Sequence, residues 1–419
     1  MLEPRELEQR RRHRETRKPK VRRSRTTVVV LFLMAGLYVA GVSAMPLASL
    51  QTETLALTIP QKTAPTLPWP NYGQSAIGAV GFGLLAKNGD PKPLPIASVA
   101  KVITALAVLK QRPIHDDQPL PILTMTAEDV ATFEKYAAQD QSVIKVELGE
   151  QLTQYQALQA LLLPSANNMA DALVRWAFGS TANYLEFVNP FTKTLGMTDT
   201  HIADASGFSP QTVSTATDLT RLAEIAMNHP VIAEIVSQPQ ADLPVAGIVR
   251  NVNRLVGYEG IVGIKTGNTD EAGGCYLFSA KRVIDGQHTV TVVGVVMGAT
   301  NLSRAIDDSL PIIEAASKEF SLTTLIQSSQ IVGRIRQAGG AQTAIIATKA
   351  LSQVTWSGQQ TTVKDIQLNR VGADVIRGEE IGQIRLETGD RVYLVPVAAA
   401  DTIAEHSYIW RLRHAAGYL

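Results

Sequence analysis

The longest hydrophobic run in the chain is the uncharged stretch 26–47, which includes Val28-Val29-Val30-Leu31-Phe32-Leu33. As a helix of about 22 residues it would span roughly 33 Å, enough to cross the core of a bilayer. The strongly basic residues 1–25 precede it, which predicts a cytoplasmic tail and an anchor at 26–48 with the rest of the chain outside the membrane. A cleavable signal peptide is the competing interpretation, since small residues surround Ala44, but such a long basic leader favours an uncleaved anchor.

After this run the polar pattern changes twice. Residues 49–72 are rich in Thr, Gln and Pro, which predicts a stiffened linker that holds the next domain off the membrane. From about residue 73 to 320 helical spacing and strand-like alternation both occur. The predicted helices are one that starts after Ser98, Thr153–Leu163, Asn167–Phe178, Tyr184–Leu195, Thr217–Asn228 and Ser303–Phe320. The predicted strands are Ile77–Ala86, Ile261–Thr266, Cys275–Val283 and Thr289–Met297.

Helices dominate the middle of this region and strands its two ends, which favours an antiparallel α/β architecture over a parallel βαβ repeat. Beyond residue 320 short apolar runs, such as 344–347, 362–368 and 391–397, alternate with glycines. This pattern predicts a small β-rich domain over 321–419.

Composition and charge add little to this picture. Hydrophobic residues make up 45% and charged residues 18% of the chain, as in a globular protein with a substantial core. The basic residues of the first 25 positions lie beside an apolar span, so membrane orientation explains them more simply than a nucleic-acid partner. Cys275 is the single cysteine, which excludes an intrachain disulfide. The histidines are scattered, so we expect no metal site and no cofactor.

The first candidate for chemistry is Ser98-Val99-Ala100-Lys101, which opens an apolar helix. Residues three apart lie on one helix face, so Lys101 can reach the Ser98 hydroxyl. A lysine acts as a base only if burial or a nearby positive charge lowers its pKa. The same spacing recurs at Ser142-Val143-Ile144-Lys145, in a β-like run, and is expected by chance roughly once or twice in a chain of this length.

The second candidate is Ser165-Ala166-Asn167, on the turn after the apolar run that ends at Pro164. A hydroxyl there can relay a proton, and an amide can bond to a lysine and to a substrate. A helix N-cap is the simpler interpretation of these two residues taken alone.

The third candidate, Lys265-Thr266-Gly267, ends a predicted strand. A lysine and a hydroxyl suit an anionic substrate terminus, and a glycine allows a ligand to approach the strand closely. An edge strand protected by a lysine is the alternative. The separations, 67 residues from Ser98 to Ser165 and 100 from Ser165 to Lys265, leave room for a helical subdomain between the motifs. Three motifs in this order form the active-site set of the penicillin-interacting serine enzymes.

Residues 74 to about 320 resemble the D-alanyl-D-alanine carboxypeptidases of the low-molecular-mass penicillin-binding proteins, serine peptidase family S11. The resemblance also rests on Gly149-Glu150-Gln151-Leu152-Thr153, Leu195-Gly196-Met197, Ser214-Thr215-Ala216, Asn253-Arg254-Leu255 and Ala272-Gly273-Gly274-Cys275. It implies a β-lactamase/transpeptidase-like α/β fold, with a five-stranded antiparallel sheet packed by helices, an all-helical subdomain and a cleft between them.

The resemblance also implies roles. Ser98 is expected to be the acylated nucleophile and Lys101 its base. Ser165 is expected to shuttle the proton, and Asn167 to orient Lys101 and the substrate. Lys265 and Thr266, beside Gly267, are expected to hold the substrate carboxylate, and the backbone amides of Ser98 and Asn268 to form the oxyanion hole. Asn268 stands where many relatives carry His or Tyr.

These expectations describe a membrane-anchored carboxypeptidase on the cell-wall face, which removes the terminal D-alanine of stem peptides ending in D-Ala-D-Ala. Its other expected partners are the bilayer, through residues 26–48, and β-lactam antibiotics as covalent inhibitors. A β-lactamase is the near alternative, but it needs a second base, and Glu186 falls in a helical run. Endopeptidase or transpeptidase activity, and a non-catalytic wall-binding protein, also stay open.

Overall fold

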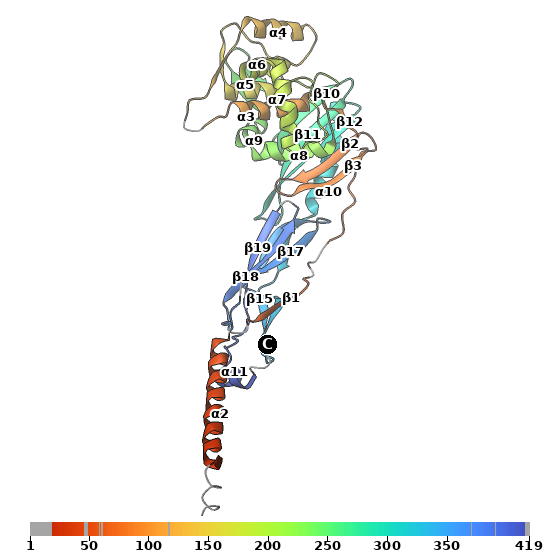
Figure 1. The fold of residues 1–419 in the computed structure, drawn as a ribbon. Helices are drawn as coiled ribbons and strands as arrows, with labels where there is room; N and C mark the ends of the chain where they lie inside the picture. Colours follow the sequence, from red (N-terminus) through yellow and green to blue (C-terminus); the bar gives the residue numbers. More distant parts are fainter. Residues whose placement is uncertain are drawn as a thin grey trace, which may run out of the picture.

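The structure is a computed structural model that describes residues 19–45, 49–57, 59, 62–115, 118–369, 371–389 and 391–414, with side chains from residue 25 onward. Most of the predicted basic tail, 1–25, therefore lies outside the described residues. The molecule is elongated (Figure 1). Helix α2 (Pro19–Ala44) forms one end, a β-rich domain follows, and a mixed α/β domain forms the other end.

The mixed domain is built on a five-stranded antiparallel sheet in the order β10-β11-β12-β2-β3. Its strands are β2 (Gln74–Ala79), β3 (Gly83–Gly89), β10 (Ile261–Thr269), β11 (Gly273–Val283) and β12 (Thr289–Ala299). The predicted antiparallel α/β architecture is confirmed. The single strand expected over Ile77–Ala86 is wrong, because Gly81 and Gly83 take positive φ angles and turn the chain into the hairpin β2–β3.

Both faces of this sheet are buried, and the interior strands β11 and β12 show it by alternation. Cys275 and Leu277 of β11 belong to one hydrophobic cluster, while Tyr276 and Phe278 belong to another. The first cluster is shared with the helical subdomain. The second is covered by α10 (Leu302–Lys318) and by the two-stranded sheet of β13 (Phe320–Ile326) and β16 (Leu351–Trp356).

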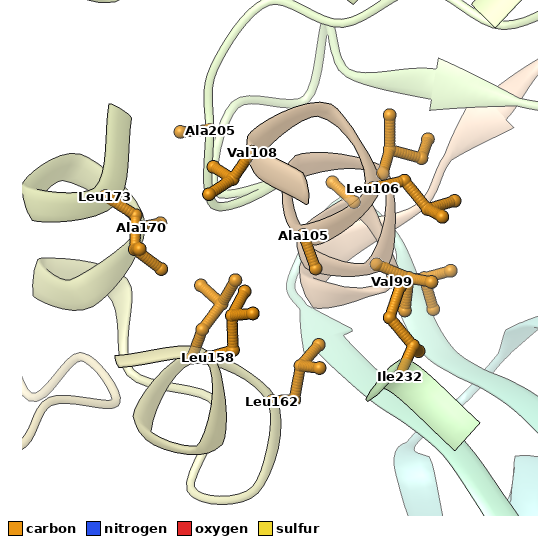
Figure 2. Packing of buried hydrophobic residues seen from close by; sticks show 14 of the residues in the cluster. Val99, Ala105, Leu106, Val108, Leu158, Leu162, Ala170, Leu173, Ala205 and Ile232 are labelled. Carbon is orange, nitrogen blue, oxygen red and sulfur yellow. The ribbon is translucent and has the colours of Figure 1, made fainter. Parts of the chain in front are cut away.

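The helical subdomain surrounds α3 (Ala100–Gln111). Every residue of this helix from Ala100 to Leu109 is buried. Neighbouring helices and the five-stranded sheet together pack around α3, so it is a central core helix rather than a surface one. Figure 2 shows Leu158 and Leu162 of α5, Ala170 and Leu173 of α6, and Ile232 of α9 lying around it. The other helices of this subdomain are α4 (Ala127–Ala137), α5 (Gln154–Leu162), α6 (Asn167–Phe178), α7 (Thr181–Thr194), α8 (Ala216–Asn228) and α9 (Pro230–Val236).

Three small two-stranded sheets complete this domain. They pair β4 (Leu94–Pro95) with β7 (Val213–Ser214), β5 (Ile122–Thr124) with β6 (Gln151–Thr153), and β8 (Gln240–Leu243) with β9 (Gly247–Arg250). Helix α5 begins at a capping box in which Thr153 and Gln156 exchange side-chain and backbone bonds. The helices predicted over Thr153–Leu163 and Asn167–Phe178 are thus confirmed within a residue.

The β-rich domain is a six-stranded antiparallel sheet in the order β1-β14-β15-β19-β18-β17. Its strands are β1 (Gln51–Thr54), β14 (Ile331–Arg336), β15 (Gln342–Ala347), β17 (Thr361–Leu368), β18 (Glu380–Thr388) and β19 (Arg391–Ala399). A short helix, α11 (Tyr408–His414), follows. The β-rich composition of the C-terminal region was therefore a correct guide to its structure.

The segment 49–72, expected to be a linker, is partly built into this domain. Strand β1 pairs with β14, and the flanking Leu50 and Ile59 are buried in the core of the β-rich domain. The four residues of β1 are polar and exposed, so the hydrophobic alternation that marks a strand is missing. The β-rich domain thus begins immediately after α2 and not at residue 321.

The packing around α5 gives a test of the core. Leu158 is fully buried, so Leu158→Ala should lower the free energy of unfolding by about 2–5 kcal/mol, through lost burial and the cavity left behind. Leu148→Ala is the matched control, because Leu148 is 71% exposed and should change little. Urea unfolding followed by tryptophan fluorescence measures both, and equal effects of the two variants would contradict this packing.

Candidate active site

Ser98 lies in a 3-10 turn, η1 (Ala97–Val99), that leads directly into α3. The turn is held between two glycines. A Cβ on Gly267 would stand 3.0 Å from the Ser98 nitrogen, and a Cβ on Gly207 would overlap the Ala97 carbonyl. Ala97 itself takes a left-handed conformation, with φ of 46°. The close backbone contacts fix Ser98 between strand β10 and the loop that carries Gly207.

The Lys101 side chain is completely buried one helical turn after Ser98. Its Nζ lies 2.7 Å from Ser98 Oγ, 2.6 Å from Asn167 Oδ1 and 2.9 Å from the Ser206 carbonyl oxygen. These three acceptors come from the η1 turn, the start of α6 and the loop before β7. Three acceptors match the three donors of an ammonium group, and a neutral amine can turn its lone pair toward the Ser98 hydroxyl.

Burial lowers the pKa of Lys101 well below its ordinary value, and the positive charge of Lys265 lowers this pKa further. The carboxylates of Asp204 and Asp171 act in the opposite direction. Burial also lowers the pKa of Lys265, to about 7. Two buried lysines with depressed pKa values are therefore close enough for one to influence the other, which is the electrostatic environment that makes a neutral lysine base available.

The second motif approaches Lys101 from α6. Asn167 is the first residue of that helix, and its side chain bridges Lys101 Nζ and Gln141 Oε1, the latter at 2.6 Å. Ser165, two residues earlier, is 5% exposed and has a φ of 65°. The interpretation as a helix N-cap does not hold, because the N-cap position belongs to Ala166 and no side chain caps it.

The third motif lies on β10, the edge strand of the five-stranded sheet beside η1. Lys265 and Thr266 are buried, Gly267 faces the Ser98 backbone, and Asn268 is exposed. Lys265 Nζ donates to the Thr266 carbonyl at 2.8 Å. The strand continues to Thr269, three residues beyond the predicted end, because it stays paired with β11 as far as Gly273.

The structure thus gathers the three motifs, and hydrogen bonds join Ser98, Lys101 and Asn167. The second Ser-x-x-Lys copy does not form a comparable pair. Ser142 and Lys145 lie on a segment outside any helix or strand, both are exposed, and Lys145 pairs with Glu147 at 2.7 Å. The Ser142 carbonyl accepts the Asn167 N–H at 2.7 Å, so this segment supports the site with its backbone.

Sequence reasoning missed the loop that supplies the Ser206 carbonyl. Asp204 holds this loop by accepting hydrogen bonds from Ser206 Oγ at 2.8 Å, the Phe208 N–H at 2.9 Å and Thr212 Oγ1 at 2.6 Å. Ser206 contacts Lys101 through its backbone carbonyl, which every residue type has, so the sequence does not reveal this role. The only available signal was Gly207, whose positive φ and contact with Ala97 require glycine.

Known proteins resemble this chain in sequence. The pattern of the Peptidase S11 family, D-alanyl-D-alanine carboxypeptidase, matches residues 79–301. The D-alanyl-D-alanine carboxypeptidase DacF of Bacillus subtilis is 25% identical over 349 residues, which cover 80% of this chain and 86% of that protein. A D-alanyl-D-alanine endopeptidase of Pseudomonas aeruginosa is 31% identical over 204 residues, which cover 46% of this chain and 62% of that protein.

The fold is also shared with a solved structure. Penicillin binding protein 5 from Haemophilus influenzae superposes with a TM-score of 0.57 at 19% identity, and the match covers 84% of this chain and all of that one. The covered part includes both the mixed domain and the β-rich domain that follows it. A penicillin-binding-protein-5-like transpeptidase fold with a C-terminal β-rich domain is therefore present, and the family match over more than half of the chain makes it a member of the S11 serine D-Ala-D-Ala peptidase family.

Proposed function

We propose that this protein is a membrane-anchored serine-type D-Ala-D-Ala carboxypeptidase that removes the terminal D-alanine of peptidoglycan pentapeptide stems. The observation that carries the proposal is the buried Lys101 Nζ, 2.7 Å from the half-buried Ser98 hydroxyl. Membership of the S11 family supports the reaction class.

In the acylation step Ser98 Oγ attacks the carbonyl carbon of the penultimate D-alanine, and its proton passes to the neutral Lys101 amine. The backbone amides of Ser98 and Asn268 stabilise the oxyanion. The carbon–nitrogen bond then breaks, and the Ser165 hydroxyl relays the proton from Lys101 to the leaving amine. D-alanine departs and leaves an ester on Ser98.

In the second step a water molecule gives a proton to Lys101 while its oxygen attacks the ester carbon. The bond to Ser98 Oγ breaks, the proton returns to that oxygen, and the shortened stem leaves as a carboxylic acid. Lys265 and Thr266 hold the C-terminal carboxylate of the substrate, and Asn167 orients Lys101 and a substrate amide. A β-lactam acylates Ser98 in the same way, which makes it a covalent inhibitor.

The same proposal includes the membrane. Helix α2 contains one stretch, Arg25–Ala44, that is long and apolar enough to span a bilayer, and only 6% of its most hydrophobic window is buried. Among the described residues, no protein surface covers the middle of this stretch, where Phe32 is 74% and Leu37 69% exposed. We place residues 1–25 in the cytoplasm, the span at 26–48, and the catalytic domain, 73–320, on the outer face with the C-terminal domain.

A second candidate reaction is cleavage of D-Ala-containing cross-links between stems. It is favoured by the 31% identical relative, which is named an endopeptidase. The β-lactamase alternative finds less support, because Glu186 is exposed on α7 and does not offer a second base inside the site. Carboxypeptidase and endopeptidase cleavage would proceed through the same acyl-enzyme on Ser98, so the two activities differ in the substrate that is cleaved.

The first test is release of D-alanine from a pentapeptide stem ending in D-Ala-D-Ala by the full chain in detergent. Ser98→Ala should reduce release on the order of a thousandfold or more, since no other group replaces the nucleophile. Ser142→Ala is the matched control from the second Ser-x-x-Lys copy and should retain full activity. Release by Ser98→Ala would contradict the nucleophile; release only from cross-linked dimers would replace the carboxypeptidase by an endopeptidase.

A second test concerns the contact between β10 and η1. A Cβ at position 267 would lie 3.0 Å from the Ser98 nitrogen and 3.1 Å from the Ile96 oxygen, so Gly267→Ala must push the strand and the nucleophile apart. We expect the acylation rate with a fluorescent penicillin to fall about 10- to 100-fold, as for a small displacement of reacting groups. Gly372→Ala, whose nearest neighbour would be 3.8 Å away, should acylate at the normal rate.

The third test uses the depressed pKa of Lys265. In the unfolded chain its pKa is near 10.5 and in the folded protein about 7, so its ammonium form opposes folding. This opposition is complete below pH 7 and disappears as pH rises from 7 to 10.5. Lys265→Met should therefore raise the thermal midpoint at pH 7, flatten the rise of stability between pH 7 and 10, and abolish penicillin acylation.

Lys281→Met is the control for this experiment, because Lys281 is exposed on the same sheet. It should change neither the pH dependence of the midpoint nor acylation. A Lys265→Met variant that is less stable than the native protein at pH 7 would show that the buried ammonium group is well compensated, contrary to the direction of its pKa.

A further inference from the structure

The C-terminal helix of the described chain lies beside the outer end of α2. The seven-residue helix α11 packs against this end, and together with β1 it connects α2 to the β-rich domain (Figure 1). Val42, in the last turn of α2, is only 3% exposed, whereas Phe32, nearer the middle of the helix, is 74% exposed. Protein therefore covers α2 at its outer end and leaves the middle open.

One face of α11 binds the end of α2 with side chains and backbone. Arg411 Nη2 donates to the carbonyl oxygens of Val42, at 3.1 Å, and Met45, at 3.2 Å. The final carbonyl groups of a helix lack partners within it, and a cation is favourable at this negative end of the helix dipole. Arg411 thus acts as a C-terminal cap for α2, supplied from the other end of the chain.

Two tyrosines extend this face. The Tyr408 hydroxyl lies 2.8 Å from Ser43 Oγ, which itself donates to the Val39 carbonyl, and the Tyr38 hydroxyl donates to the Leu412 carbonyl. Positions 408, 411 and 412 are three and four residues apart and lie on one side of a helix. Both helices therefore contribute a tyrosine to the same contact.

The opposite face of α11 rests on the β-rich domain. His406, Trp410 and His414 are spaced four residues apart and stack, with ring centroids 3.5 Å and 4.3 Å from one ring to the next. The Trp410 ring lies against Gly339 in the turn between β14 and β15, and His406 contacts the Ala338 carbonyl in the same turn. Helix α11 thus bridges the turn and α2.

We propose that α11 and the outer end of α2 form a clasp that fixes the β-rich domain to the membrane-spanning helix. The partner of the C-terminal segment is then the N-terminal helix of the same chain, and the mature protein retains α2. A signal peptidase cut at the small residues around Ala44 would remove Tyr38, Val39, Val42 and Ser43, and with them most of the contacts between α11 and α2. The proposal depends on the membrane anchor proposed above and does not depend on the peptidase reaction.

Binding of α11 to the lipid surface is the competing arrangement. The roles of Arg411 and Arg413 distinguish it from the clasp. Arg411 is half-buried and bonded to α2, while Arg413 is exposed two residues later. A headgroup surface would attract both charges about equally, at a similar gain for each. Of these two arginines, only Arg411 contributes to a clasp with α2.

The experiment places the photo-reactive amino acid p-benzoylphenylalanine at position 38 of the full chain, in bacterial membranes, in place of the Tyr38 ring that contacts α11. Illumination should link position 38 to the segment 408–414, which mass spectrometry of the digested protein identifies. The same amino acid at Phe32, which is exposed on the same helix, should give no such link. Arg411→Ala should reduce the yield about fivefold, as expected for loss of a charged cap, and Arg413→Ala should leave it unchanged.

Two results would overturn the proposal. One is a mature protein without residues 1–44, seen from its N-terminal peptide, which would mean that α2 is a signal sequence. The other is an intact chain whose position 38 links only to lipid, or whose link depends equally on both arginines, which would place α11 on the bilayer. D-alanine release measured on the same membranes reports separately on the proposed reaction, because neither arginine lies in the catalytic domain.

Discussion

The candidate active site depends on the position of one side-chain amine, that of Lys101, which is buried away from solvent. Lys101 is fully buried, and a buried lysine must find acceptors within the protein or lose its proton. Its acceptors come from three separate parts of the chain, so the η1 turn, the start of α6 and the loop at Ser206 must all assemble around one nitrogen atom. Strand β10 then closes the fourth side through the contact of Gly267 with the Ser98 backbone.

This arrangement explains the heavy packing around α3. A helix buried on every side cannot rotate or tilt, so Ser98 and Lys101 keep their relation to Asn167 without help from flexible surface groups. The cost is electrostatic, because two lysines with depressed pKa values lie in the same interior. The large apolar cluster shared by the helices and one face of the sheet provides the stability that offsets it.

Much of this arrangement could be predicted from the sequence. The motif residues lie at helix starts and strand ends, where local sequence patterns are strong. The order of the motifs was sufficient to predict that Ser98, Lys101 and Asn167 lie in one site. Features carried by the backbone escaped: the Ser206 carbonyl has no signature in its side chain, and the Gly81–Gly83 turn divided what resembled one strand. Strand β1 escaped because Gln51-Thr52-Glu53-Thr54 is polar throughout and is defined only by its distant partner β14. Pairing between strands that are far apart in the sequence cannot be predicted from the local pattern of either strand.

The position of β1 has a consequence for how the molecule is made. Since Gln51 pairs with Arg336, the whole catalytic domain is an insertion between the first two neighbouring strands of the β-rich sheet. With residues 1–25 held in the cytoplasm, the part of the chain that follows α2 crosses the membrane first. Strand β1 is therefore exposed beside the membrane long before β14 arrives, so the distal domain folds while the proximal one is incomplete. The polar, fully exposed side chains of β1 suit this interval, because an unpaired hydrophobic edge would invite aggregation with neighbouring nascent chains. The polar sequence of β1, which prevents its prediction as a strand, is thus also the property that keeps it soluble until β14 is available for pairing.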